Sequence, residues 1–216
     1  MSELLKVRDL SIYWENRPVL EHFNLQVEPG EHLVLMAPSG TGKTTLLRTL
    51  MGLTEGKKKK SPKSGDREKA ACRVEGEILF CGERMTLLFQ EPRLLGHLSA
   101  LENVALVLPD SMNKDAKKKE ALRCLRLVEM EEHADKLPGE LSGGMLKRTA
   151  LARAMARGGD LILLDEPFSS LDEGLTLRMI QMIQEEWGDR TLILVTHSTR
   201  EAEAFSPGRY IHIPLL

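Results

Sequence analysis

The stretch that decides the fold is LVLMAPSGTGKTTLLRTL, residues 33–50. Its first four residues are apolar and predict a buried strand, and the leucines that follow Lys43 predict an apolar helix. A turn rich in small residues connects the two. A strand, a loop containing Gly-Lys-Thr and a helix, in this order, predict a loop that binds phosphate.

The residue types in this loop suit phosphate binding. Gly40 and Gly42 lack a Cβ, so backbone N–H groups can converge on one anion. The helix start adds free N–H groups and the positive end of the helix dipole. We expect Lys43 to reach the β- and γ-phosphates and the Thr44 hydroxyl to bind Mg²⁺. Ala37 stands where the strict phosphate-loop pattern has glycine. The alternative to a phosphate-binding loop is a glycine-rich turn between strand and helix that binds no ligand.

Length and composition narrow the class of protein. The chain has 216 residues, enough for one large domain or for a domain with a subdomain. A net charge of −2 does not favour a general nucleic-acid-binding surface. No apolar run approaches the ~20 residues that cross a bilayer, and the charged N-terminus is unlike a secretory signal. Three widely spaced cysteines, Cys72, Cys81 and Cys124, indicate a reducing compartment and no metal site.

The N-terminal third of the chain reads as strands and turns. Alternation predicts strands at residues 4–14 and 19–27 with a turn at residues 16–18. Tyr13 and Trp14 could stack on a nucleotide base or pack within the strand. Lysine-rich residues 57–69 predict a solvated loop, or alternatively a contact with an anionic surface. Later patterns predict strands at 74–80 and 86–89, and helices at 101–108, 114–130 and 145–157.

Polar side chains follow three of the predicted strands. Gln90 follows residues 86–89, Asp165 and Glu166 follow the apolar residues 161–164, and His197 follows residues 191–196. A strand that is apolar throughout is typical of a parallel sheet, whose carboxyl edge is where open α/β domains bind ligands. The alternative for each position is a structural role. Gln90 would be an ordinary loop residue, the two acids would merely end a strand, and His197 would be a structural histidine.

The two adjacent carboxylates predict a bound cation, because burying such charge without a partner is costly. Successive strand residues point in opposite directions, so we expect Asp165 and Glu166 to do different jobs. We assign Asp165 to Mg²⁺ and Glu166 to the attacking water, as a general base or its positioner. His197 would contact the γ-phosphate or hold the water.

A second anion site is predicted at Ser142, Gly143 and Gly144. Ser142 can cap the helix that follows, and the two glycines expose its first N–H groups. Taken alone, this pattern is only a helix cap.

Together these motifs resemble the ATP-binding subunit of an ABC transporter over almost the whole chain. APSGTGKTT (37–45) resembles the Walker A loop, LSGGM (141–145) the signature, LILLDEP (161–167) the Walker B strand and SSLD (169–172) the D-loop. Gln90 corresponds to the Q-loop glutamine and His197 to the switch histidine. The usual glutamine after the signature glycines is replaced by Met145, which leaves the phosphate-binding residues in place.

The resemblance implies an α/β fold. Its parts would be a P-loop NTPase (RecA-like) core with a mostly parallel sheet, an N-terminal antiparallel β-subdomain and an α-helical signature subdomain. Within a single ABC ATPase domain over residues 1–216, we expect the β-subdomain at 1–32 and 66–85 and the helical subdomain at 93–157. The core would take residues 33–56, 86–92 and 158–216.

The resemblance also implies roles for individual residues. The metal would be held by Thr44, Gln90 and Asp165, and catalysis would use Glu166, His197 and Gln90. Trp14, with Tyr13 second, fits the adenine-stacking aromatic. The remaining nucleotide-binding residues would be Pro38, Ser39, Gly40, Thr41, Gly42, Lys43, Thr44, Thr45, Ser142, Gly143, Gly144 and Asp172.

The partners follow from the same resemblance. Two cassettes, a homodimer or a pair of ABC ATPase subunits, would close head to tail around ATP and Mg²⁺ and reopen on hydrolysis. Separate transmembrane permease subunits would dock near Glu91, Arg93 and Leu94, at the cytoplasmic face of the membrane, with a solute-binding protein and no nucleic acid. Residues 89–95 and LSGGM resemble importers of the nitrate, sulfonate and taurine group. The alternatives are an exporter ATPase, a soluble ABC ATPase acting on DNA or ribosomes, and a non-hydrolysing nucleotide sensor.

Overall fold

The computed structural model describes residues 3–15, 17–36, 40–54, 72–206 and 210–213. The expectations for Ala37, Pro38 and Ser39 and for residues 57–69 therefore lie outside the described residues. The elements, in chain order, are β1 (Leu5–Trp14), β2 (Arg17–Val27), β3 (His32–Met36), α1 (Lys43–Leu50), β4 (Cys72–Phe80), β5 (Met85–Leu88), α2 (Ala100–Ala105), α3 (Lys114–Leu127), η1 (Glu131–His133), η2 (Pro138–Glu140), α4 (Gly143–Arg157), β6 (Leu161–Asp165), α5 (Glu173–Trp187), β7 (Thr191–Thr196), α6 (Thr199–Phe205) and β8 (Tyr210–His212).

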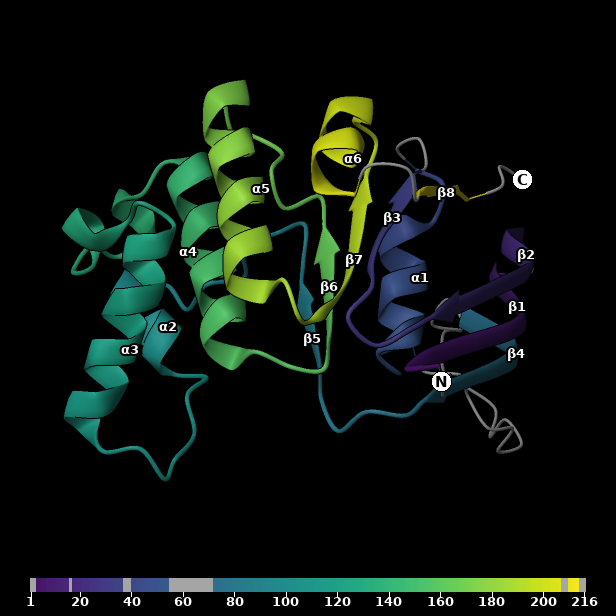
Figure 1. The fold of residues 1–216 in the computed structure, drawn as a ribbon, viewed down its shortest axis with the longest axis horizontal. Helices are drawn as coiled ribbons and strands as arrows, with labels where there is room; N and C mark the ends of the chain where they lie inside the picture. Colours follow the sequence, from purple (N-terminus) through teal and green to yellow (C-terminus); the bar gives the residue numbers. More distant parts are fainter. Residues whose placement is uncertain (1–2, 16, 37–39, 55–71, 207–209, 214–216) are drawn as a thin grey trace, which may run out of the picture.

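Two sheets organise the described part of the chain. One has the order β5-β6-β7-β3-β8 with every neighbouring pair parallel, and the other has the order β2-β1-β4 with antiparallel pairs. Figure 1 shows α2 to α5 on one side of the parallel sheet, and α1 with the antiparallel sheet on the other. The expected α/β fold is thereby confirmed. Within the described residues, no helix has the length and apolar character needed to cross a membrane.

Alternating side chains of the central strands build two separate cores. Leu161 and Leu163 of β6 pack towards α1 and the antiparallel sheet. Ile162 and Leu164 pack on the opposite face, with α4, α5 and α6. This period of two is what a strand buried on both faces requires. The same alternation predicts that Asp165, the last residue of β6, points to the side of α1, as Leu161 and Leu163 do.

Several predicted boundaries are wrong by a few residues. The helix predicted at 114–130 ends at Leu127, where Met130 N donates to Leu125 O (2.8 Å) and Glu129 N to Arg126 O (3.0 Å). This is a Schellman ending with Glu129 at φ 56°, a position at which glycine is usual. The sequence offers no glycine there to announce the end. Arg178 compensates with an ion pair to Glu129 (2.7 Å).

Other boundaries shift because of local pairing. Arg17 and Pro18, predicted as a turn, pair with Trp14 and Tyr13 at the start of β2. Proline is tolerated there because β2 is an edge strand. The helix predicted at 101–108 ends at Ala105 and continues as turns, and the helix predicted at 145–157 begins at Gly143, directly after its cap Ser142.

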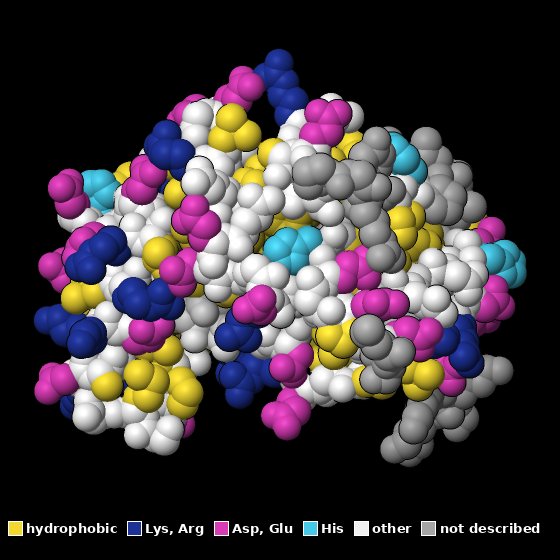
Figure 2. Space-filling view, in the orientation of Figure 1, with side chains coloured by type: hydrophobic (Ala, Val, Ile, Leu, Met, Phe, Trp, Pro, Cys, Tyr) yellow, Lys and Arg dark blue, Asp and Glu magenta, His cyan; other side chains and the backbone are white. Residues whose placement is uncertain are grey.

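Acidic and basic side chains are mixed on the helical part of the molecule. Figure 2 shows them interspersed at the left of this face rather than gathered by sign. Among the described residues this view gives no broad basic surface of the kind that binds nucleic acid.

Asn103 fixes the loop at residues 95–99, directly before α2. It is fully buried in α2, and its side-chain oxygen accepts a hydrogen bond from Leu95 N at 2.8 Å. Its amide group donates to the carbonyl oxygens of Leu95 (3.1 Å), Leu98 (2.9 Å) and Ser99 (3.0 Å). The Asn103 side chain therefore provides hydrogen-bond partners for backbone groups of a loop that belongs to neither a helix nor a sheet.

We expect Asn103→Leu to lower the free energy of unfolding by about 3 kcal/mol, because it removes four side-chain hydrogen bonds and leaves Leu95 N and Leu98 O without these partners. The matched control is Asn113→Ala, which removes one exposed helix cap and should cost about 1 kcal/mol. Urea denaturation followed by circular dichroism measures both. Equal losses for the two variants would contradict this role of Asn103.

Candidate active site

The polar residues that end the parallel strands meet at the start of α1. Gln90 and His197 follow β5 and β7 on the carboxyl edge of the sheet, Asp165 is the last residue of β6, and Lys43 is the first residue of α1. The structure therefore brings together residues up to 154 positions apart in the chain, taken as 197 minus 43. This edge is where α/β sheets of this kind bind ligands.

The turn before α1 needs glycine at Gly42. Its φ is 84°, and a Cβ there would lie 2.2 Å from Val19 Cγ1 of β2. Gly42 provides no side-chain cap, and no acidic residue lies in the first turn of α1. This helix start therefore has neither a side-chain cap nor an acidic residue that would compete with an anion for its dipole. Gly40, also at φ 84°, Thr41 and Thr45 lie beside it.

The carboxylate of Glu166 contacts three other polar side chains of the site. Its Oε1 lies 2.8 Å from Lys43 Nζ and 3.4 Å from His197 Nδ1, and its Oε2 accepts a hydrogen bond from Gln90 Nε2 at 3.2 Å. Burial opposes ionisation of Glu166, but the hydrogen bond and charge of Lys43, with His197, outweigh it and lower the pKa of this carboxyl. Glu166 is therefore a carboxylate at neutral pH.

The Asp165 side chain points to the face of β6 that packs on α1, as the alternation of β6 predicts. Its Oδ2 accepts a hydrogen bond from Thr44 Oγ1 at 2.7 Å, and the residue is 1% exposed. Burial raises the pKa of Asp165, although the bond from Thr44 opposes the shift. Its Oδ1 is buried and has no hydrogen-bond partner among the described residues. A buried carboxylate oxygen with spare lone pairs beside a threonine hydroxyl fits a Mg²⁺ ligand set.

The loop that carries His197 is held by its neighbours. Thr196 Oγ1 donates to Glu201 Oε2 (2.5 Å) and accepts from Ser198 N (3.1 Å). The His197 side chain itself remains 56% exposed. A fixed backbone with an exposed ring suits a residue that contacts a ligand.

The predicted second anion site lies at the surface. Ser142 and Gly143 are exposed, and Ser142 Oγ caps α4 by accepting a hydrogen bond from Met145 N at 3.3 Å. Gly144 faces the loop after β6, since a Cβ there would lie 3.3 Å from Ser170 O. Asp172, also exposed, caps α5 through Leu175 N at 2.9 Å. These residues do not join the cluster around Glu166, and their outward position leaves them accessible to another molecule.

The two candidate aromatic residues differ in their surroundings. The Tyr13 hydroxyl donates to Glu21 Oε1 at 3.1 Å, and the Arg73 guanidinium lies 4.2 Å from its ring centre. Trp14 is 47% exposed and pairs with Arg17, two residues before Val19, whose side chain abuts Gly42. The Tyr13 side chain therefore already has two partners, whereas the Trp14 side chain is half exposed.

Sequence reasoning missed two basic residues of α4. Lys147 Nζ donates to Glu166 O at 3.2 Å, and Arg153 donates to the carbonyl oxygens of Pro92 (2.8 Å) and Arg93 (2.9 Å). A signal exists for Lys147, because Leu151, one turn further along the helix, is buried. A basic residue on the inward stripe of a helix calls for a specific partner.

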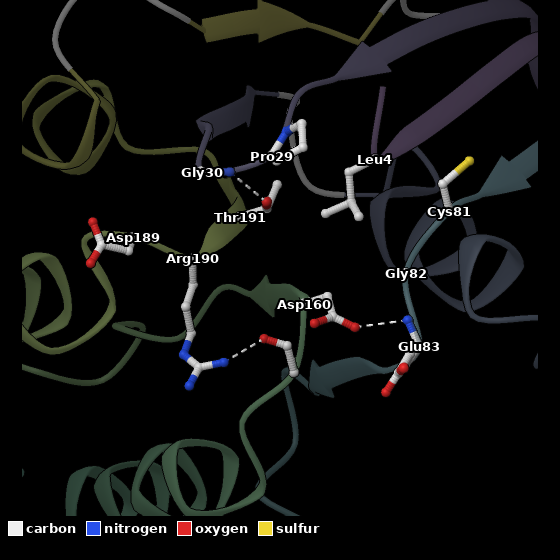
Figure 3. A pocket seen from close by; sticks show the side chains of 11 residues that line it. Leu4, Pro29, Gly30, Cys81, Gly82, Glu83, Asp160, Asp189, Arg190 and Thr191 are labelled. Atoms are coloured by element: carbon white, nitrogen blue, oxygen red, sulfur yellow. Dashed lines mark hydrogen bonds between the residues drawn. The ribbon is translucent and has the colours of Figure 1, made fainter. Parts of the chain in front are cut away.

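A separate open cleft lies at the opposite, amino edge of the parallel sheet. It holds about 430 Å³ and is lined in part by Cys81, Glu83 and Arg190. Two of its polar side chains are paired within the chain, as Figure 3 shows: Asp160 Oδ2 accepts from Glu83 N (2.8 Å), and Arg190 donates to Gly159 O (2.9 Å). None of the predicted site residues lines this cleft.

Comparison with known proteins agrees with this geometry. The family model described as ABC transporter matches residues 20–169. The chain is 34% identical over 217 aligned residues to the thiamine import ATP-binding protein ThiQ of Salmonella paratyphi A, covering 94% of this chain and 84% of that protein. It is 40% identical over 186 residues to the aliphatic sulfonates import ATP-binding protein SsuB of Granulibacter bethesdensis, covering 85% and 69%.

A solved structure is similar over nearly the whole chain. The dimeric post-hydrolysis state of the ATP-binding cassette MJ0796, bound to ADP and Pi, matches with a TM-score of 0.79 at 27% identity and covers 97% of this chain and 94% of that chain. The chain therefore belongs to the ABC transporter family, as an ATP-binding subunit with ATPase activity.

Proposed function

We propose that this chain powers an importer. It binds ATP with Mg²⁺, pairs with a second cassette, and drives separate permease subunits from the cytoplasmic face of the membrane. The convergence of Lys43, Gln90 and His197 on the carboxylate of Glu166 carries the proposal. Import is supported by the similarity to the import proteins named above. The permease and a solute-binding protein select the solute.

The Lys43–Glu166 ion pair is the element that ATP changes. A triphosphate carries more charge than one carboxylate and competes for the ammonium group of Lys43. Glu166 then keeps Gln90 and His197 as neighbours and can orient the attacking water or take its proton.

The residues that would hold Mg²⁺ are Thr44, Asp165 and Gln90. The unpaired buried oxygen of Asp165 supports this assignment. When bound, Mg²⁺ neutralises charge on the phosphate groups during their transfer. Asp165 and Thr44 keep each other oriented through their own hydrogen bond.

The exposed start of α4 supplies the second contact with nucleotide. Ser142, Gly143 and Gly144 lie at the surface or near it, away from the Glu166 cluster of their own chain. We assign them to the γ-phosphate of ATP held by the partner cassette, with Asp172 close to the same interface. Each ATP is then bound from two sides, which explains why it would close the pair.

We expect Glu166→Gln to lower the turnover number at least 100-fold, because the amide cannot accept a proton from water. Phosphate release measures the loss. The control is Glu203→Gln, an exposed acid of α6 that should keep normal turnover. Turnover of Glu166→Gln within about twofold of the wild type would contradict the role given to Glu166.

We expect ATP to convert the slow Glu166→Gln protein into dimers, as measured by light scattering during size-exclusion chromatography. Adding Ser142→Asp should abolish the dimer, since aspartate still caps α4 but repels phosphate. Asn113→Asp, a matched change at the cap of α3, should leave dimerisation intact. Dimers of the Ser142→Asp double variant would remove Ser142 from the interface.

We expect Trp14→Ala to raise the KM for ATP about tenfold, through loss of base stacking worth roughly 1.4 kcal/mol. Tyr13→Phe removes only the hydroxyl that donates to Glu21 and should leave KM unchanged. An unchanged KM in Trp14→Ala would contradict the stacking role given to Trp14.

A further inference from the structure

Lys147 is a half-buried lysine of α4 whose ammonium group reaches the loop of Glu166. Its Nζ donates to Glu166 O at 3.2 Å and also bonds to Ser169 Oγ. Burial lowers the pKa of Lys147, although the charges of Glu166, Asp165 and Glu201 oppose the shift. Removing a charge from water to bond a backbone carbonyl has a cost, so the contact calls for a reason beyond solubility.

The backbone of Glu166 provides that reason. Its φ is 44°, in the left-handed region, which costs a non-glycine residue about 1–2 kcal/mol. Such a conformation persists only when surrounding contacts hold it. Glu166 N donates to Val195 O (2.9 Å), and Glu166 O accepts from Ser169 Oγ (3.0 Å) and from Lys147. Ser169 N also donates to Glu166 O at 3.3 Å, and Lys147 is the charged donor in this set.

Helix α4 has a second contact of the same kind. Arg153 donates to the carbonyl oxygens of Pro92 and Arg93, in the segment directly after Gln90. Gln90 and Glu166 in turn bond to each other. The helix that begins with Ser142 thus holds the backbone on both sides of the Gln90–Glu166 contact.

We infer that Lys147 is a positioning residue, which fixes the left-handed backbone of Glu166 and so aims its carboxylate at the attacking water. The inference rests on the proposed role of Glu166. Lys147 does not touch the reacting atoms, and it acts through the Glu166 carbonyl. Misplacing a catalytic group by a small distance slows the chemical step while leaving substrate binding intact.

The test uses the full chain and compares Lys147→Met with Lys147→Arg. We expect Lys147→Met to lower kcat about tenfold with KM for ATP unchanged, and Lys147→Arg, which keeps charged donors, to recover kcat to within about threefold of the wild type. Lys118→Met, at an exposed lysine of α3, is the matched control and should keep normal kinetics. Wild-type kcat in Lys147→Met, or a rise in KM with kcat unchanged, would overturn the inference.

A double-mutant cycle separates this inference from the proposed function. In single-turnover assays, Lys147→Met should have little further effect in a Glu166→Gln background, because Lys147 acts only by orienting a carboxylate that this background no longer has. Additive losses would show that Lys147 acts elsewhere. Slow Glu166→Gln with a normal Lys147→Met would overturn the inference alone, whereas normal turnover of Glu166→Gln would overturn the proposed function and the inference together.

Ser169→Ala is a second test of the Glu166 carbonyl contact, for use if Lys147→Met does not fold. This change removes the hydroxyl that shares the Glu166 carbonyl with Lys147. We expect it to lower kcat by a few-fold at constant KM. An unchanged kcat would count against the carbonyl contact as the means of positioning.

Discussion

The ion pair between Lys43 and Glu166 is the interaction on which the site depends. At 2.8 Å it joins the start of α1 to the end of β6, and both side chains are nearly buried. An isolated charge at such a depth would be costly, so each requires the other while no nucleotide competes. Gln90 and His197 complete the surroundings of the same carboxylate. Three strands and one helix therefore meet at a single acidic group.

The parallel sheet makes this convergence possible. Strands β5, β6 and β7 are neighbours in it, so residues distant in the chain end at one edge. The alternation within β6 directs the Asp165 side chain to Thr44 of α1. The left-handed backbone of Glu166 (φ 44°) then directs its carboxylate to Gln90 and His197 as well as to Lys43. Two adjacent acids thereby receive different surroundings, and burial moves the pKa of Asp165 up while Lys43 and His197 hold that of Glu166 down.

Much of this could be predicted from the sequence, because each motif couples residue type to a strand end or a helix start. The α/β class and the parallel strands followed from these patterns, and the family from the resemblance of the motifs to an ABC transporter subunit; these predictions are confirmed. The convergence on Glu166 could not be predicted, since it depends on strand order. Lys147 and Arg153 also escaped notice, because a basic residue on a helix is normally expected to face water. The Schellman ending at Glu129 lacked its usual glycine, so the end of α3 was misplaced.

The central claim is that nucleotide takes Lys43 from Glu166. A crystal structure of the chain with Mg²⁺ and a non-hydrolysable ATP analogue tests it most directly. We predict that Lys43 Nζ bonds to phosphate oxygens, and that the Glu166 carboxylate is separated from Lys43 but still contacts Gln90 or His197. A Lys43–Glu166 distance that stays near 2.8 Å with the triphosphate bound would contradict the account.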